Sequence, residues 1–103
     1  MGVNDKIVYK GDVGVRINLY LRNTDINVSD VVSSKLVVKK SDGTVVDWIL
    51  NQGTDDDGED CLYYVSVLGD FDVIGNYRLQ PAITTNNGSY RVKPFIIKVK
   101  DVI

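Results

Sequence analysis

The strongest constraint on the fold is the alternation of apolar and polar residues from Val13 to Arg22. Apolar side chains occupy every odd position from Val13 to Leu21, and mostly polar ones lie between them. A period of two places neighbouring side chains on opposite faces of an extended chain, so this segment is predicted to be a half-buried β-strand. No segment sustains the 3.6-residue period of an amphipathic helix. The sequence therefore predicts an all-β protein.

Further strands are predicted where β-branched and aromatic residues lie between turn-forming residues. They cover residues 7–10, 35–40, 45–50, 61–68, 77–83 and 90–99. Asp42-Gly43 and Asn87-Gly88 favour tight hairpins, and the polar segment 51–60 is predicted to be a loop. Pro81 and Pro94 are expected at a sheet edge or a bulge, because proline donates no ladder hydrogen bond. About seven short strands with regularly spaced turns predict a sandwich or a small barrel.

Length, composition and charge limit both the fold and the kinds of partner that the chain can have. A chain of 103 residues suits one hydrophobic core, so residues 1–103 are predicted to form a single domain. Apolar residues at 44 % and charged residues at 25 % are typical of a folded domain. The formal net charge of −2 predicts no basic face that neutralises phosphates, so no nucleic acid is expected as a partner. No apolar run approaches the roughly 20 residues that span a bilayer, so no membrane association is expected.

The cysteine and histidine content excludes several enzyme classes. Cys61 is the only cysteine, so no internal disulfide can form, and it is expected to be a buried small hydrophobe on a strand. The chain has no histidine. A cysteine–histidine pair, a serine–histidine–aspartate triad and a histidine-bearing zinc site are therefore excluded. We expect no enzyme activity, no catalytic residues and no cofactor.

Five carboxylates lie within the six residues from Asp55 to Asp60. Hard cations such as Ca²⁺ prefer oxygen ligands, which makes Asp55, Asp57 and Glu59 weak candidates for a metal site. A calcium-binding hand loop has its glycine at the sixth position, whereas Gly58 is the fourth residue counted from Asp55. A solvated acidic hairpin tip is the favoured interpretation, and no metal is expected.

The segment from Asp72 to Tyr77 resembles the corner that precedes strand F in immunoglobulin-like domains. In that corner a tyrosine hydroxyl bonds to backbone a few residues upstream. The match is to the Gly75-x-Tyr77 half, because one extra residue separates Asp72 from the glycine. We therefore expect a buried Tyr77 ring with its hydroxyl bonded to nearby backbone.

Three segments together resemble the N-terminal immunoglobulin-like domain of phage baseplate upper proteins. They are Tyr9–Val15, the hairpin Val37–Val46, and Ile74–Tyr77, and the resemblance extends from about Ile7 to Lys100. It implies an immunoglobulin-like β-sandwich of about seven antiparallel strands. It also implies a structural or adaptor role in a tailed-phage virion, on the baseplate, tail, neck or capsid surface, after synthesis in the host cytoplasm. Domains of that family usually head a longer chain, so this chain is either a stand-alone adaptor or a fragment.

Both faces of the predicted strand 61–68 carry apolar residues, which is more than one sandwich core consumes. The alternate residues that include Cys61 are expected to face the core, which leaves the residues between them exposed. The predicted interface residues are Tyr20, Val37, Leu62, Tyr64 and Leu68. Exposed apolar side chains commonly mark protein interfaces, so docking onto other virion proteins or self-association is expected.

A carbohydrate-binding module that contributes to host-surface attachment is the alternative function. It would need exposed aromatic rings on one sheet face or at loop tips, and the chain has one tryptophan and six tyrosines. Most aromatic residues on strands pack in cores, so protein assembly is the favoured interpretation.

Overall fold

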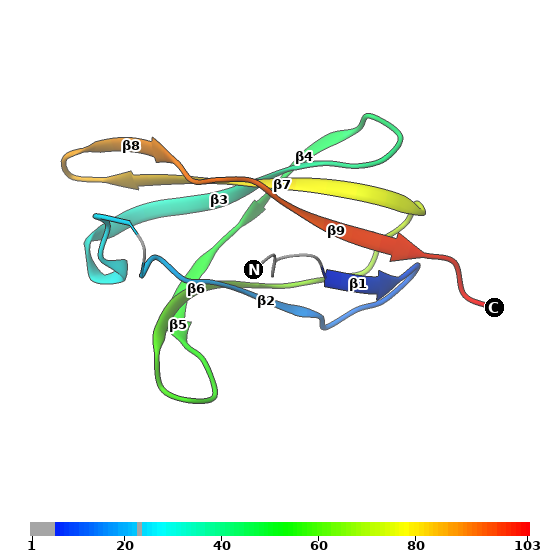
Figure 1. Cartoon of the computed structure of the whole chain (residues 1–103), viewed down its shortest axis with the longest axis horizontal. Helices are drawn as coiled ribbons and strands as arrows, with labels where there is room; N and C mark the ends of the chain where they lie inside the picture. The colour runs from blue at the N-terminus through cyan, green and yellow to red at the C-terminus, as the bar shows by residue number, and fades with distance from the viewer. Residues whose placement is uncertain (1–5, 23) are drawn as a thin grey trace.

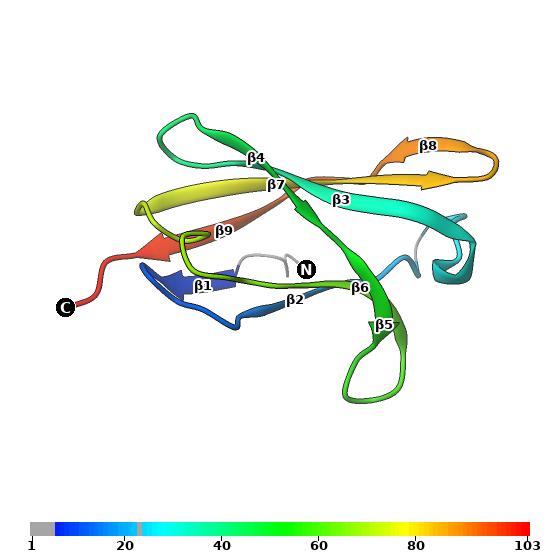
Figure 2. The same cartoon turned by 180° about the vertical axis from the view of Figure 1, so that it is seen from behind.

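Two β-sheets pack face to face in the computed structural model, which describes residues 6–22 and 24–103 (Figures 1 and 2). The strands are β1 (Lys6–Tyr9), β2 (Arg16–Leu19), β3 (Val31–Lys39), β4 (Val45–Ile49), β5 (Asn51–Thr54), β6 (Asp60–Val65), β7 (Gly75–Thr85), β8 (Gly88–Arg91) and β9 (Phe95–Lys100), with one 3-10 turn, η1 (Val28–Asp30). The large sheet has the order β1-β9-β7-β3-β4, and β8 pairs with β7. The small sheet has the order β2-β6-β5. The predicted all-β, immunoglobulin-like sandwich is confirmed.

One hydrophobic core lies between the sheets. Strand alternation puts Leu36 and Val38 of β3 inside, together with Tyr77 and Leu79 of β7, and all four are fully buried. The remaining buried members of the core are Val8, Ile17, Leu21, Val31, Trp48, Leu50, Leu62, Phe71, Ile83, Ile97 and Val99. Cys61 is buried as predicted. The described residues include no helix that is long and apolar enough to cross a membrane.

The strand pattern differs from the prediction at three places. Residues 51–54, predicted to be part of a loop, form the edge strand β5, which pairs with β6. The predicted strand 90–99 is two strands, because the chain leaves β7 after Arg91 and returns to it at Phe95. The third difference is that β1 pairs with β9 in a parallel arrangement, while all other pairs are antiparallel.

Pro81 lies in the middle of β7, where the strand changes its neighbour. Residues before it pair with β9, those after it pair with β8, and its carbonyl accepts a hydrogen bond from the Val92 N–H at 3.1 Å. The missing proline N–H would point toward this same side, into the gap between the two neighbours. Pro94 lies between β8 and β9, outside both strands. The prediction of an edge strand or a bulge is therefore wrong for both prolines: Pro81 lies in a central strand, opposite the break between β8 and β9, and Pro94 lies in the connection between those two strands. At both places the missing N–H breaks no ladder hydrogen bond.

The tyrosine corner is confirmed. The Tyr77 ring is fully buried, and its hydroxyl donates to the Val73 carbonyl at 3.0 Å and accepts from the Val73 N–H at 3.1 Å. Burial raises the pKa of this hydroxyl. Gly75 has φ of 118°, a conformation that L side chains rarely adopt. Asp72 forms an ion pair with Lys40 at 2.8 Å, which lowers the pKa of the carboxyl.

Candidate functional site

The five residues predicted as an interface do not form one patch. Leu62 is fully buried and belongs to the core, so its prediction as an interface residue is wrong. Leu68 is 85 % exposed, in the connection after β6. Val37 is half-buried on the outer face of the large sheet, and Tyr20 is half-buried next to β2 of the small sheet.

Tyr64 packs at the edge of the core and is not a fully exposed surface residue. Its half-buried ring stacks on Trp48, with ring centroids 4.9 Å apart and planes 10° apart. Its hydroxyl donates to Asp70 at 2.6 Å, and burial together with this hydrogen bond raises the pKa of the hydroxyl. The expectation that the Cys61 phase of β6 faces the core is therefore wrong, because Leu62 and Tyr64 pack there instead.

The acidic segment is the tip of the β5–β6 hairpin, and two of its three candidate metal ligands are engaged elsewhere. Asp55 accepts backbone N–H groups of Asp57 and Glu59, both at 2.9 Å, and the Tyr20 hydroxyl at 2.7 Å. The bond from Tyr20 and those backbone bonds lower the pKa of Asp55. Glu59 forms a two-bond ion pair with Arg22. Within the described ranges no group of three or more potential ligands could hold a metal ion.

We expect the thermal midpoint in excess Ca²⁺ to lie within about 3 °C of that in EDTA, because a metal that bound only the native state would raise it. Asp55 and Glu59 already have protein partners, which a cation would have to displace. Thermal melts followed by circular dichroism measure the difference. A larger shift, lost in Asp57→Asn, would establish a metal site at the tip.

The outer face of the large sheet collects basic side chains from four strands, β3, β7, β8 and β9. Residues that pair directly across neighbouring strands point to the same face of the sheet. Partners of the core residues therefore point toward the small sheet, and the residues that alternate with them point away from it. The cations on this outer face are Lys35, Lys39, Arg78, Arg91, Lys98 and Lys100. The one acidic residue paired into it is Asp47, which forms an ion pair with Lys35 at 3.0 Å. We call this surface the basic face.

Apolar side chains lie between the cations of the basic face. Val45 and Ile49 of β4 are 57 % and 64 % exposed, Val37 of the adjacent strand β3 is half-buried, and Ile96 of β9, on the far side of β7, is half-buried too. Ile7 of β1 continues the surface past Lys98. A face that combines exposed apolar groups with unneutralised cations is suited to bind an acidic protein surface.

The basic face corrects a prediction made from composition. A net charge of −2 predicted no such face, but half of the twelve basic residues lie on one side of one sheet. The net charge is a sum over the whole chain and does not show where the charges lie. In a strand, alternate residues point to opposite faces, so basic residues can gather on one face of a sheet even when the net charge is negative.

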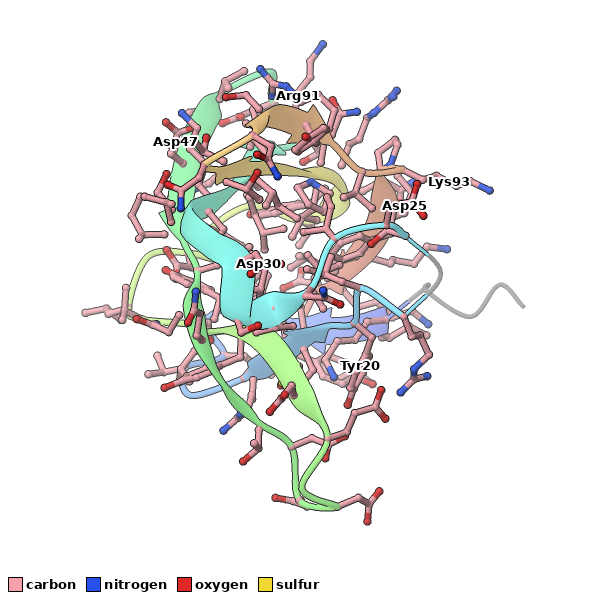
Figure 3. The ribbon with its side chains drawn as sticks, turned by 90° about the vertical axis from the view of Figure 1, so that its left-hand side faces the viewer. Tyr20, Asp25, Asp30, Asp47, Arg91 and Lys93 are labelled. Carbon is pink, nitrogen blue, oxygen red and sulfur yellow. The ribbon has the colours of Figure 1, made fainter. Side chains whose placement is uncertain are left out.

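A cleft of about 770 Å³ opens at one end of the sandwich. Tyr90 of β8 pairs with the core residue Ile83, so it faces the side on which the small sheet lies, and it is 41 % exposed. Figure 3 shows Arg91 and Lys93 on one side of this end and Tyr20 on the other. The remaining lining residues are Thr24, Asp25, Ile26, Asn27, Asp30, Thr85, Asn87 and Val92.

Comparison with known proteins supports the fold. The structure is similar to the crystal structure of CopC from Methylosinus trichosporium OB3b, with a TM-score of 0.55 and 12 % sequence identity, over 97 % of this chain and 87 % of that one. No protein-family model matches the sequence, and no curated protein matches it. At this identity the likeness to CopC establishes the sandwich architecture alone.

Proposed function

We propose that this chain is a non-enzymatic assembly domain that docks onto other proteins through the basic face. The observation that carries the proposal is the basic face itself, where exposed Val45 and Ile49 lie among cations of which only Lys35 is ion-paired within the described residues. Exposed apolar groups supply burial on binding, and the surrounding charges supply orientation and choice of partner.

The proposed setting is a tailed-phage virion, in which the chain acts as a structural or adaptor protein of the baseplate, tail, neck or capsid surface. This setting rests on the sequence resemblance to baseplate upper proteins, carried by Tyr9–Val15, Val37–Val46 and Ile74–Tyr77. Labelling of purified particles with an antibody raised against the chain tests the setting directly.

The substitution Ile49→Asp tests the docking face. Because it places a charge in the apolar part of the basic face, it is expected to weaken binding to virion proteins, or self-association, by about tenfold or more. Leu68→Asp is the matched control, since Leu68 is more exposed than Ile49 but lies off the face. Multi-angle light scattering of each variant, alone and with candidate virion proteins, measures the effect. If Leu68→Asp abolishes binding and Ile49→Asp does not, the face is wrongly assigned.

The cleft at the end of the sandwich favours a second candidate function, a carbohydrate-binding module. Tyr90 offers an exposed ring, and carboxylates and amides in the lining could bond sugar hydroxyls. The other tyrosine of the cleft is less suited to stacking, because the Arg22 guanidinium lies 4.3 Å from the centre of the Tyr20 ring. A monomer that binds no virion protein, but binds a glycan array in a way that Tyr90→Ala abolishes and Tyr9→Ala does not, would favour this second function.

A further inference from the structure

The basic face contains two cations directly opposite each other on adjacent strands. Lys39 of β3 pairs with Arg78 of β7 in the antiparallel register, and both are exposed. Like charges in this position destabilise a sheet, because the Cβ atoms of paired residues lie only about 5 Å apart. Neither cation forms an ion pair within the described ranges. A carboxylate bound between them would relieve the repulsion.

The same row continues with an apolar residue on each side of the pair. Val45 pairs with Lys39, and Ile96 pairs with Arg78, so four adjacent strands present an apolar, basic, basic, apolar row. Strands lie about 4.8 Å apart, which makes the row roughly 15 Å wide. A phosphodiester backbone would leave Val45 and Ile96 uncovered, whereas a protein loop that carries carboxylates can cover them.

The β5–β6 hairpin tip supplies such a loop. Of its five carboxylates, Asp55 accepts a hydrogen bond from Tyr20 and Glu59 is paired with Arg22. The other three, Asp56, Asp57 and Asp60, form no ion pair within the described part of the chain. All three of these residues are exposed. We call these three residues the acidic tip.

The acidic tip and the basic face lie on opposite sides of the molecule. Figure 1 shows the hairpin tip at the bottom and the large sheet with β3, β4 and β7 at the top, and Figure 2 shows the same arrangement from behind. The two surfaces therefore cannot neutralise each other within one chain. Both are free to bind a second copy at the same time.

We propose that the acidic tip of one copy docks on the basic face of a second copy, centred on Lys39 and Arg78. The inference rests on the proposed function, since it names the partner of that same face. Because the two surfaces point in opposite directions, a two-fold dimer cannot form both contacts at once. The contact is heterologous, and its repetition gives a ring or an open filament.

Charge reversal on either surface tests the contact. Lys39→Glu with Arg78→Glu makes both surfaces acidic, and Asp56→Lys with Asp57→Lys makes both basic, so each double variant alone is expected to lose self-association by about tenfold or more. An equimolar mixture is expected to recover it, because every contact then joins opposite charges. Lys6→Glu with Lys93→Glu is the control for net charge, since neither residue lies on the basic face. Sedimentation velocity at about 0.05 M and 0.5 M salt measures association, which is expected to weaken at the higher salt.

Three results would overturn the inference. A parent chain that stays monomeric at low salt but binds a virion protein through the basic face would remove the second copy as partner and leave the proposed function standing. A monomer that binds no virion protein would remove both. Binding of a single-stranded oligonucleotide that is lost in Lys39→Glu with Arg78→Glu, without self-association of the parent, would assign the face to nucleic acid.

Discussion

Replacing Tyr77 with alanine is expected to destabilise the fold by about 3–5 kcal/mol, the range for truncating a large buried aromatic residue. The ring is fully buried and contacts the Phe71 ring, with centroids 5.8 Å apart. Since domains of this size are stable by roughly 5–15 kcal/mol, the loss is a large share of the total. The thermal midpoint is expected to fall by about 15 °C or more.

Tyr77→Phe separates the contribution of the hydroxyl to stability from that of the ring. It keeps the packing and removes the hydroxyl that holds both backbone groups of Val73, so the expected cost is about 1 kcal/mol. Urea unfolding of both variants gives the two free energies. A Tyr77→Ala protein that unfolds like the parent would show that the corner contributes nothing to stability.

The second large effect is expected for Leu62→Ala, at about 2–5 kcal/mol of lost stability, because Leu62 is fully buried in the core and the substitution leaves a cavity. Leu68→Ala removes the same atoms from a side chain that is 85 % exposed, so it is expected to change stability by less than about 0.5 kcal/mol. Chemical denaturation measures both variants. Equal losses at the two positions would contradict the assignment of the inner face of β6.

This pair of leucines shows where the sequence was insufficient. In β3, where Val37 was predicted to face outward, the neighbours Leu36 and Val38 are buried, so the outward face of that strand was predicted correctly. Strand β6 is the central strand of the small sheet, and the adjacent residues Cys61 and Leu62, which point to opposite faces, are both fully buried. Alternation therefore could not identify the inner face, and the choice depended on tertiary packing that the pattern does not contain.

The sequence predicted the corner at Tyr77 and the hairpin turn at Gly43 because both depend on local backbone chemistry. Gly43 has φ of 91°, and the Asp42 side chain accepts the Thr44 N–H at 2.9 Å. The basic face was missed for the opposite reason. It joins residues from β3, β7, β8 and β9, and their common side is fixed only by the register between strands distant in the chain.

The parallel pairing of β1 with β9 has a consequence for the order of folding. Within the described residues β9 is the only strand that pairs with β1, and about 85 residues of chain separate the two strands. During synthesis β1 leaves the ribosome before β9 but cannot enter the large sheet until β9 has followed. Until then the edge of β7 that β9 later covers is open to pairing with other chains. Strand β1 is therefore made early but incorporated late, and the nascent chain is most exposed to misassembly just before β9 appears.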